Sequence, residues 1–265
     1  MKIVFYGNCQ AQAASFAIQA RNKSLTVEYA GNSHRVDLFD PERSWRLLDE
    51  ADAIVTQSIM NMDNEDNHEA LRARFGDRAI FMPYVFVDGL HSFSLTTPVH
   101  HKLVVDHLLG GTFLLDHLRR HGVRKTIWDY RVGKIDFHHR DRFNRTMAEM
   151  RRREAASGCE IRIADDIERM YRTSQMMLTH NHPSPDLMNI ISGKIADRLG
   201  LSFSDITPEE MHAYARIILP VSVTIATPWC KSELGLTYPY DLQWFFQGRD
   251  MIQRLARAYE IGDES

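Results

Sequence analysis

The sequence lacks the features that define several common classes of protein. Its 265 residues include three cysteines, without a CxxC pair, and carry a formal net charge of −3. So few and widely spaced thiols do not make the disulfide framework of a small secreted domain. The small net charge offers no general attraction for nucleic acid, and no run of about 18 apolar residues indicates a membrane span. We therefore expect a cytoplasmic protein with no nucleic-acid partner and no segment inserted in a membrane.

Several motifs of cofactor binding and catalysis are absent as well. No GxGxxG, GxxxxGK[ST] or GxSxG occurs, so the usual signatures of dinucleotide binding, P-loop nucleotide binding and serine α/β hydrolases are missing. The pairs His100-His101 and His138-His139 do not form an HExxH motif, and neither has a nearby set of cysteine and carboxylate partners that resembles a zinc site. We therefore predict that the protein holds no metal.

The sequence does contain enough apolar material for a sizeable core, with 44% hydrophobic and 25% charged residues. Its first third alternates between short β-rich runs at Lys2–Tyr6, Leu25–Tyr29, Ala53–Thr56 and Ala79–Met82 and helix-favouring stretches at Gln10–Arg21, Pro41–Glu50 and His68–Phe75. Ile3-Val4-Phe5 and Ala53-Ile54-Val55 are apolar throughout, so we interpret them as strands covered on both faces and joined in parallel by the helices. The pattern predicts an α/β fold with a doubly wound, mostly parallel sheet, whose ligands bind beyond the carboxyl ends of the strands.

The pattern becomes helical from Thr97 to Ser157, with a bend at Gly110-Gly111 and a very basic helix at Arg140–Ser157. Later elements are expected as helices at Pro185–Leu199, Pro208–Arg216 and near Leu242–Tyr259, and as a β-like run at Val221–Ala226. We predict a single α/β domain over residues 1–265, with a helical insertion or subdomain at about residues 97–175.

Cys9 is the candidate nucleophile. It follows the first buried strand in the run Gly7-Asn8-Cys9-Gln10, and the alanine-rich stretch behind it favours a helix. A thiol at a helix N-terminus meets unpaired backbone N–H groups and the positive end of the helix dipole, which favour the thiolate. The same N–H groups can stabilise an oxyanion, so Gly7, Asn8 and Gln10 are candidate substrate or oxyanion residues. The alternative is that Cys9 is a small buried hydrophobic side chain without chemistry.

A thiolate nucleophile needs a base, and His182 is the candidate because it lies on a loop before a helix and is followed by Pro183. Asn181 is adjacent and is a further candidate of the site. The alternative for His182 is a residue near a helix cap with no catalytic task, since the chain has thirteen histidines. Gln57 ends the Ala53–Thr56 strand at the same sheet edge as Cys9, where its amide can donate to a substrate carbonyl.

Two further groups have a structural explanation beside the functional one. Asp88 and His91 follow the fourth strand toward the same crevice, but Asp88-Gly89 is also a common turn pair. The arginines of the basic helix usually form a solvated face. The alternative is that Arg151 and Arg152 bind a phosphorylated cofactor, because guanidinium groups match phosphate oxygens two at a time.

Three motifs carry a resemblance to a known family. The run Gly7-Asn8-Cys9-Gln10, the strand from Ala51 to Gln57 and the late Asn181-His182-Pro183-Ser184 resemble the WcbI family of capsular polysaccharide biosynthesis enzymes. The motifs span most of the chain, and the middle helical region is matched in texture. Members of that family are implicated in O-acetylation of capsule sugars and bind coenzyme A. The resemblance therefore implies an acyltransferase that takes its acyl group from a thioester such as acetyl-CoA and acts on a glycan or a nucleotide-sugar precursor.

The layout is also similar, more distantly, to the SGNH hydrolases and acetyltransferases, with their flavodoxin-like sheet. In that group a serine follows the first strand and a late block supplies an aspartate and a histidine, and Cys9 and His182 occupy comparable places. The sequence departs from the group in two ways, because a cysteine replaces the serine and Thr179 stands where the aspartate is expected. The carboxylate that would orient the imidazole is therefore not identified, and Asn181 or a backbone carbonyl is the alternative.

These features predict an O-acyltransferase in which Cys9 accepts an acyl group from a CoA thioester and His182 acts as base for transfer to a sugar hydroxyl. In one alternative the transfer is direct and Cys9 only shapes or gates the site. In a second, water replaces the sugar and the protein is an SGNH-like esterase. In a third, the protein is a non-catalytic module that binds CoA or a sugar, with Cys9 as a packed thiol.

Overall fold

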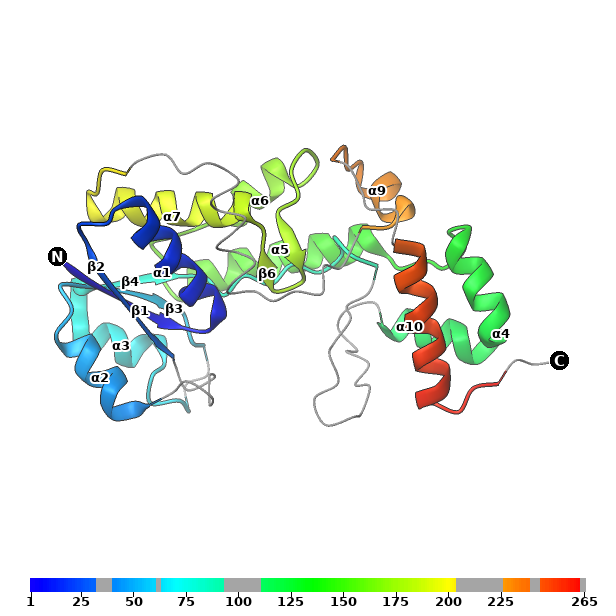
Figure 1. Ribbon diagram of the computed structural model, residues 1–265, viewed down its shortest axis with the longest axis horizontal. Coiled ribbons are helices and arrows are strands. Elements are labelled where there is room, and N and C mark those ends of the chain that lie inside the picture. The colour runs from blue at the N-terminus through cyan, green and yellow to red at the C-terminus, as the bar shows by residue number, and fades with distance from the viewer. Residues whose placement is uncertain (32–39, 61–62, 93–110, 204–225, 239–243, 263–265) are drawn as a thin grey trace. The chain divides into compact units, whose positions relative to one another are not determined.

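The computed structural model describes residues 1–31, 40–60, 63–92, 111–203, 226–238 and 244–262 (Figure 1). By its contacts the chain divides into two compact units. The first unit comprises Met1–Val85, Ala148–Met170 and His182–Val221, and the second comprises Phe86–Met147, Tyr171–Asn181 and Ser222–Ser265. The single domain with an insertion at about residues 97–175 stays a prediction. His100-His101, the predicted helix Pro208–Arg216 and residues 221–225 of the predicted β-like run lie outside the described residues.

A four-stranded parallel sheet forms the centre of the first unit. Its strands are β1 (Lys2–Gly7), β2 (Thr26–Gly31), β3 (Ala53–Gln57) and β4 (Ala79–Met82). They lie in the order β2-β1-β3-β4, and each neighbouring pair is parallel. Gly7 is in register with Gly31 and Gln57 with Met82, so the carboxyl ends of all four strands meet at one edge. The predicted α/β class and the parallel sheet are confirmed.

Four helices of the first unit begin after a capping side chain that the sequence supplies. The elements between and after the strands are α1 (Cys9–Arg21), α2 (Pro41–Asp49), α3 (His68–Phe75), η1 (Gly76–Arg78), α6 (Ala164–Met170), β6 (His182–Pro183) and α7 (Pro185–Leu199). Asn8, Asp40, Asn67 and Ser184 each accept a hydrogen bond from an N–H group in the first turn of the helix that follows. α7 ends at Gly200, whose φ of 63° is the left-handed conformation that glycine adopts readily. The helices predicted from local pattern are therefore confirmed, with small shifts at their ends.

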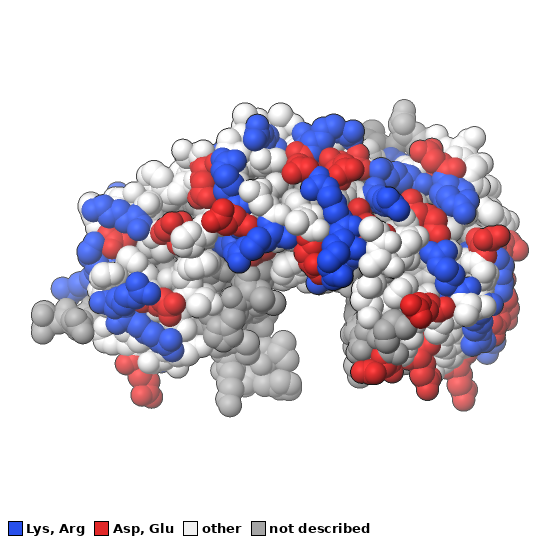
Figure 2. Space-filling model, turned by 180° about the vertical axis from the view of Figure 1, so that it is seen from behind, with Lys and Arg blue, Asp and Glu red and all other residues white. Residues whose placement is uncertain are grey.

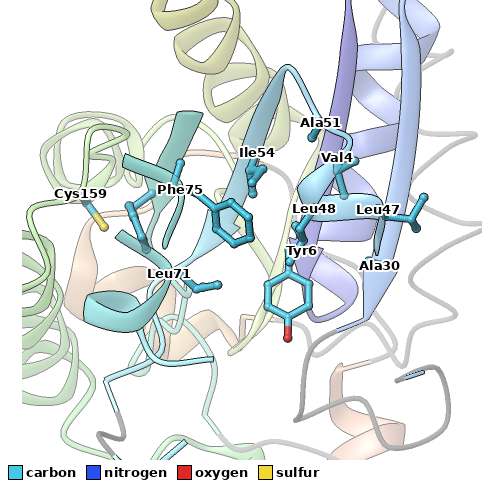
Figure 3. Close-up of a cluster of buried hydrophobic side chains, with 12 residues drawn as sticks. Val4, Tyr6, Ala30, Leu47, Leu48, Ala51, Ile54, Leu71, Phe75 and Cys159 are labelled. Atoms are coloured by element: carbon cyan, nitrogen blue, oxygen red, sulfur yellow. The ribbon is translucent and has the colours of Figure 1, made fainter. Parts of the chain in front are cut away.

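Apolar side chains cover both faces of the sheet, as the uninterrupted apolar runs predict. Val4, Tyr6 and Ile54 point to one face, where they form a buried cluster with side chains of α2 and α3 (Figure 3). The alternate residues of β1 and β3 are buried on the opposite face, along which α1 packs on β1 and β2 and against α7. Figure 1 shows α1 and α7 across the sheet from α2 and α3. Each fully buried Val, Ile or Phe stabilises the fold by about 1.5–3 kcal/mol relative to an exposed side chain.

The second unit is mainly helical in the part of the chain that the structure describes. Its elements are α4 (Gly111–Arg131), β5 (Met177–Thr179), α9 (Pro228–Leu234), α10 (Trp244–Ala258) and the first half of α5 (His139–Ala156), whose second half belongs to the first unit. Leu114 and Leu118 of α4 form a buried cluster with Ile252 and Leu255 of α10. α4 begins at Gly111 and contains one non-helical residue, Gly122. α5 and α10 confirm the predicted helices at Arg140–Ser157 and Leu242–Tyr259.

Candidate active site

Cys9 lies at the first position of α1, directly after the loop that leaves β1. Its side chain is partly exposed, whereas Cys159 and Cys230 are buried. Asn8 caps the helix, because its Oδ1 accepts the N–H of Gln10 at 2.8 Å. The thiol thus lies at the N-terminal end of a 13-residue helix, where backbone N–H groups and the helix dipole favour an anion.

Two buried glutamines tie this loop to the neighbouring strands, and we refer to Gln10 and Gln57 as the glutamine clamp. Gln57 Oε1 accepts the backbone N–H of Asn8 at 2.8 Å, and Gln57 Nε2 donates to Gln10 Oε1 at 3.2 Å. Gln10 Oε1 also accepts the N–H of Val85 at 2.9 Å, and Gln10 Nε2 donates to the Val85 carbonyl at 2.8 Å. The loop before Cys9 is therefore fixed to the end of β3 and to the segment that follows β4.

The glutamine clamp also explains the glycine at position 7. A Cβ atom on Gly7 would lie 2.6 Å from Gln57 Oε1 and 2.8 Å from the Cβ of Ala11, closer than side chains approach one another. Gly7 therefore permits the close approach of β1 to Gln57. The contacts described above give Gly7, Gln10 and Gln57 a positioning task, and their direct contact with a substrate stays a prediction.

His182 begins β6, two residues before Ser184, the cap of α7. Its imidazole is half-buried, and this burial lowers its pKa below the ordinary value of 6.5. The ring is consequently unprotonated at neutral pH, which is the form that a general base requires. Cys9 begins α1 and His182 precedes α7, and these two helices pack against each other in the first unit. The approach of the His182 ring to the Cys9 sulfur stays a prediction.

The other polar candidate residues make contacts within the second unit. Thr179, which stands where an SGNH enzyme has its aspartate, donates from Oγ1 to Asn181 Oδ1 at 3.1 Å. Asp88 Oδ1 accepts the N–H of Gly89 at 2.8 Å, as its turn interpretation predicts. The Asp88 carboxylate also forms a buried ion pair with Arg142 in the second unit. Asp88 therefore has a structural role.

A cavity of about 560 Å³ opens within the first unit beside Asn8 and Gln57. Its walls come from residues 58–60 after β3, from residues 83–84 after β4 and from the last turns of α5. Among its lining residues, Cys159 Sγ lies 3.1 Å from Ser58 Oγ and 3.2 Å from Ser157 Oγ, and burial raises the pKa of this thiol. Cys159 is thus a protonated lining group rather than a second nucleophile.

Sequence reasoning missed Ser58, Tyr84 and Cys159 as lining residues of this cavity. Ser58 follows β3 and Tyr84 follows soon after β4. Because ligands bind at the carboxyl ends of parallel strands, these positions could have been predicted from the sequence. Cys159 gave no such signal, since it is 101 positions away from Ser58 and reaches the cavity only through the fold.

The structure separates the two arginines that were predicted to bind a cofactor. Arg152 and its neighbour Arg153 line the cavity. Arg151 instead pairs with Asp165, at 2.9 Å from Nε, and with Glu168. On the face shown in Figure 2, Lys and Arg side chains are interspersed with Asp and Glu.

The described part of the chain contains no group of three or more histidine, cysteine or carboxylate side chains arranged to hold a metal ion. Among the same residues, none of the helices is long and apolar enough to cross a membrane.

Comparison with known proteins gives one family and one structural likeness. The family model described as polysaccharide biosynthesis enzyme WcbI matches residues 2–204. A solved structure of WcbI is similar over 98% of this chain and 94% of that chain, with a TM-score of 0.50 and 19% sequence identity. That structure is described as the native protein without a disulfide bond between coenzyme A and one of its cysteines. At this identity the likeness concerns the fold alone. No protein in the curated set matches the chain.

Proposed function

Because the chain belongs to the WcbI family of polysaccharide biosynthesis enzymes, we propose that it is a CoA-dependent O-acyltransferase, with an acetyl group as the acyl group. The acceptor is a hydroxyl group of a capsular polysaccharide or of a nucleotide-sugar precursor. Cys9 is the nucleophile and His182 the base. The observation that carries the proposal is the position of Cys9, which is partly exposed at the first residue of a capped helix, at the carboxyl edge of a parallel sheet.

His182 removes the proton from the Cys9 thiol, and the thiolate attacks the carbonyl carbon of the acyl thioester. The C–S bond to CoA breaks, and the CoA thiolate takes the proton back from His182. An acyl-cysteine remains. His182 then takes the proton of the acceptor hydroxyl as its oxygen attacks this thioester, and Cys9 leaves as a thiolate that the imidazolium reprotonates. The backbone N–H groups at the start of α1 stabilise the oxyanion of both steps.

Two further observations support this mechanism. The solved WcbI structure is described with reference to CoA and a cysteine. This description supports a CoA thioester as the acyl donor. The burial that lowers the pKa of His182 favours its neutral, proton-accepting form. The rate of transfer should therefore rise with pH to a plateau whose midpoint lies below 6.5, the ordinary pKa of histidine.

The strand order β2-β1-β3-β4 with helices on both faces supports a doubly wound, SGNH- or flavodoxin-like classification of the first unit. A reducing cytoplasm keeps Cys9 as a thiol, and we propose that the reaction takes place there. The proposed partners are the CoA thioester and the glycan or nucleotide sugar.

The decisive experiment is to trap the acyl-enzyme. Incubation with acetyl-CoA in the absence of an acceptor should add one acetyl group, which peptide mapping locates on Cys9 and not on Cys159 or Cys230. Cys9→Ala should abolish the adduct and reduce turnover by about a thousandfold or more, which is the scale of losing a nucleophile. Near-normal turnover of Cys9→Ala would show that the covalent route is wrong and that His182 activates the acceptor directly.

The same preparation separates transfer from hydrolysis. If the acyl group is released at the same rate when only water is offered, the protein is an esterase. If Cys9 reacts slowly with a thiol reagent near neutral pH and no adduct forms, Cys9 is a packed thiol and the protein is a non-catalytic binding module.

A further inference from the structure

The cavity beside the glutamine clamp has a size and a set of side chains that the acyl-transfer step does not require. We propose that this cavity binds the phosphate-bearing part of a substrate, with Arg152 and Arg153 as its anion-binding groups. The inference rests on the proposed function in one respect: acyl transfer from CoA to a sugar explains why a ligand with a phosphate group binds at this site. Its volume of about 560 Å³ is in the range of small-molecule sites, which hold much more than a single anion.

The arginines of the cavity share one counterion. Glu149 accepts hydrogen bonds from Arg152 Nε and Nη2 at 2.7 and 2.8 Å and from Arg153 Nε at 2.7 Å. These bonds lower the pKa of Glu149 to about 2, so it is a fixed negative charge. Two guanidinium groups with one carboxylate leave one surplus positive charge. Arg152 Nη1 and both Nη groups of Arg153 make no hydrogen bond with the residues that the structure describes, so they remain as donors for phosphate oxygens.

Arg151, the preceding residue of the same helix, has more negative than positive charge in its ion pairs. Arg151 pairs with two carboxylates, Asp165 and Glu168, and does not line the cavity. The surplus charge is therefore confined to the side of α5 that faces the cavity. Arg151 differs from Arg153 in its partners but not in residue type or helix, which makes it a matched control.

Glu154 is the acidic residue of the cavity wall. Its Oε1 accepts the backbone N–H groups of Ile163 and Ala164, at 2.8 and 3.1 Å, and these lie at the start of α6. The helix end thus compensates the Glu154 carboxylate, and burial raises its pKa. Among the described residues, Glu154 forms no ion pair with Arg152 or Arg153, so it does not occupy their donor groups.

The remaining walls fit the rest of such a ligand. They are largely apolar and come from Ile59, Met60, Pro83, Tyr84 and Met150. Asn8 also lines the cavity and directly precedes Cys9. A ligand held by its phosphate at Arg152 and Arg153 can therefore extend along apolar side chains to the loop of the nucleophile. The acyl donor, a CoA thioester, and a nucleotide-sugar acceptor both carry phosphate groups. The experiment distinguishes these two ligands.

The test measures binding to the full chain by isothermal titration calorimetry, without turnover. The probes are CoA, dephospho-CoA, pantetheine, which has no phosphate, and UDP. We expect Arg152→Gln and Arg153→Gln each to raise the Kd of a phosphate-bearing probe about tenfold, the scale of one charge-assisted hydrogen bond. Pantetheine binding should not change, and Arg151→Gln should stay within about twofold of wild type, because exposed, paired charges contribute little.

The pattern across probes identifies the ligand. If the variants bind CoA more weakly and UDP unchanged, the cavity belongs to the acyl donor. If dephospho-CoA binding is then affected less than CoA binding, Arg152 and Arg153 contact the 3′-phosphate of CoA. Weaker binding of UDP with unchanged CoA assigns the cavity to the acceptor. Arg153→Lys, which keeps the charge but loses the planar fork, should fall between wild type and Arg153→Gln.

Three results would overturn the inference. The first is a wild-type protein that binds none of the phosphate-bearing probes, and the second is an Arg152→Gln/Arg153→Gln variant that binds all of them like wild type. The third is an equal loss in Arg151→Gln, which would reveal general surface electrostatics. Each is distinguishable from failure of the proposed function, since trapping of acyl-Cys9 is measured separately. The side chains of Arg152 and Arg153 are 64% and 46% exposed, and a matching melting temperature confirms that the variants fold.

Discussion

The two units satisfy their buried polar groups in different ways. In the first, the backbone is paired by parallel strands, the sheet interior is apolar, and the polar glutamine clamp lies at the strand ends. In the second, side chains hold residues 88–92. Arg142 pairs with Asp88 and donates to the carbonyls of His91, Ser92 and Phe137, at 3.3, 3.2 and 3.1 Å.

The same segment has further side-chain partners. His139 Nδ1 lies 2.8 Å from the carbonyl oxygen of Gly89, and Cys230 Sγ donates to the carbonyl of Leu90 at 3.3 Å. Because buried carbonyls need donors, an irregular segment without a strand partner depends on such side chains. The comparison teaches that the first unit should tolerate changes of charge and pH better than the second.

The largest expected effect tests this difference directly. Asp88→Asn leaves the buried Arg142 guanidinium without its counterion, and breaking a buried pair in this way costs roughly 3–5 kcal/mol. Hydrogen exchange with peptide resolution should show loss of protection in the second unit. Glu149→Gln is the control, because it breaks an exposed pair in the first unit, and such pairs contribute about 1 kcal/mol or less. Equal loss in both units after Asp88→Asn would break the comparison.

Acid should also act on the second unit first. Burial lowers the pKa of His91 to about 3 and of His139 to about 4, with nearby positive charges such as Arg142 adding to the effect. The unfolded chain therefore binds these protons near pH 6.5, so stability is full above that pH and falls as the pH drops toward the folded values. At pH 5 each histidine should cost about 2 kcal/mol.

Denaturation at pH 7 and pH 5 measures this loss. His139→Gln should reduce the pH dependence, whereas substitution of its exposed neighbour, His138→Gln, should leave it unchanged. A His139→Gln variant with the full acid sensitivity of wild type would exclude His139 as a source.

In the first unit, the largest polar effect should come from the glutamine clamp. Gln57→Leu leaves the Asn8 N–H without its partner and removes one of the two donors to Gln10 Oε1, which costs about 1–3 kcal/mol. It should also slow labelling of Cys9 by a thiol reagent, because the loop before Cys9 loses its anchor. Gln19→Leu is the matched control: its amide contacts Leu25 and Val27 near the other end of α1, so stability should fall without an effect on Cys9.

The smallest effect separates capping from chemistry. Asn8→Ala and Asn67→Ala each remove a side chain that caps a helix of the first unit, and each should cost about 1 kcal/mol by chemical denaturation. Only Asn8→Ala should change the reactivity of Cys9, since α3 carries no candidate residue. Equal Cys9 labelling rates in both variants would mean that the cap of α1 does not tune the thiol.

The sequence predicted those parts of the fold that depend on local pattern. β1 to β4 are short β-rich runs, and α1, α2, α3 and α7 follow capping residues, so both were visible without long-range information. The glutamine clamp could not be predicted from local pattern, because Gln10 and Gln57 are 47 positions apart and meet only through the order of the strands. The choice between Arg151 and Arg153 also depends on tertiary structure, since adjacent residues of one helix point in different directions.

The close packing of Gly7 against Gln57 has a consequence for how this scaffold can vary. A methyl group at position 7 would displace the Gln57 carboxamide, while a shorter side chain at position 57 would not reach the amide nitrogen of Asn8. A replacement of Gly7 therefore requires a shorter side chain at position 57, and this second change gives up the hydrogen bond to Asn8. In laboratory evolution, libraries that randomise position 7 alone should yield fewer functional clones than libraries that randomise positions 7 and 57 together.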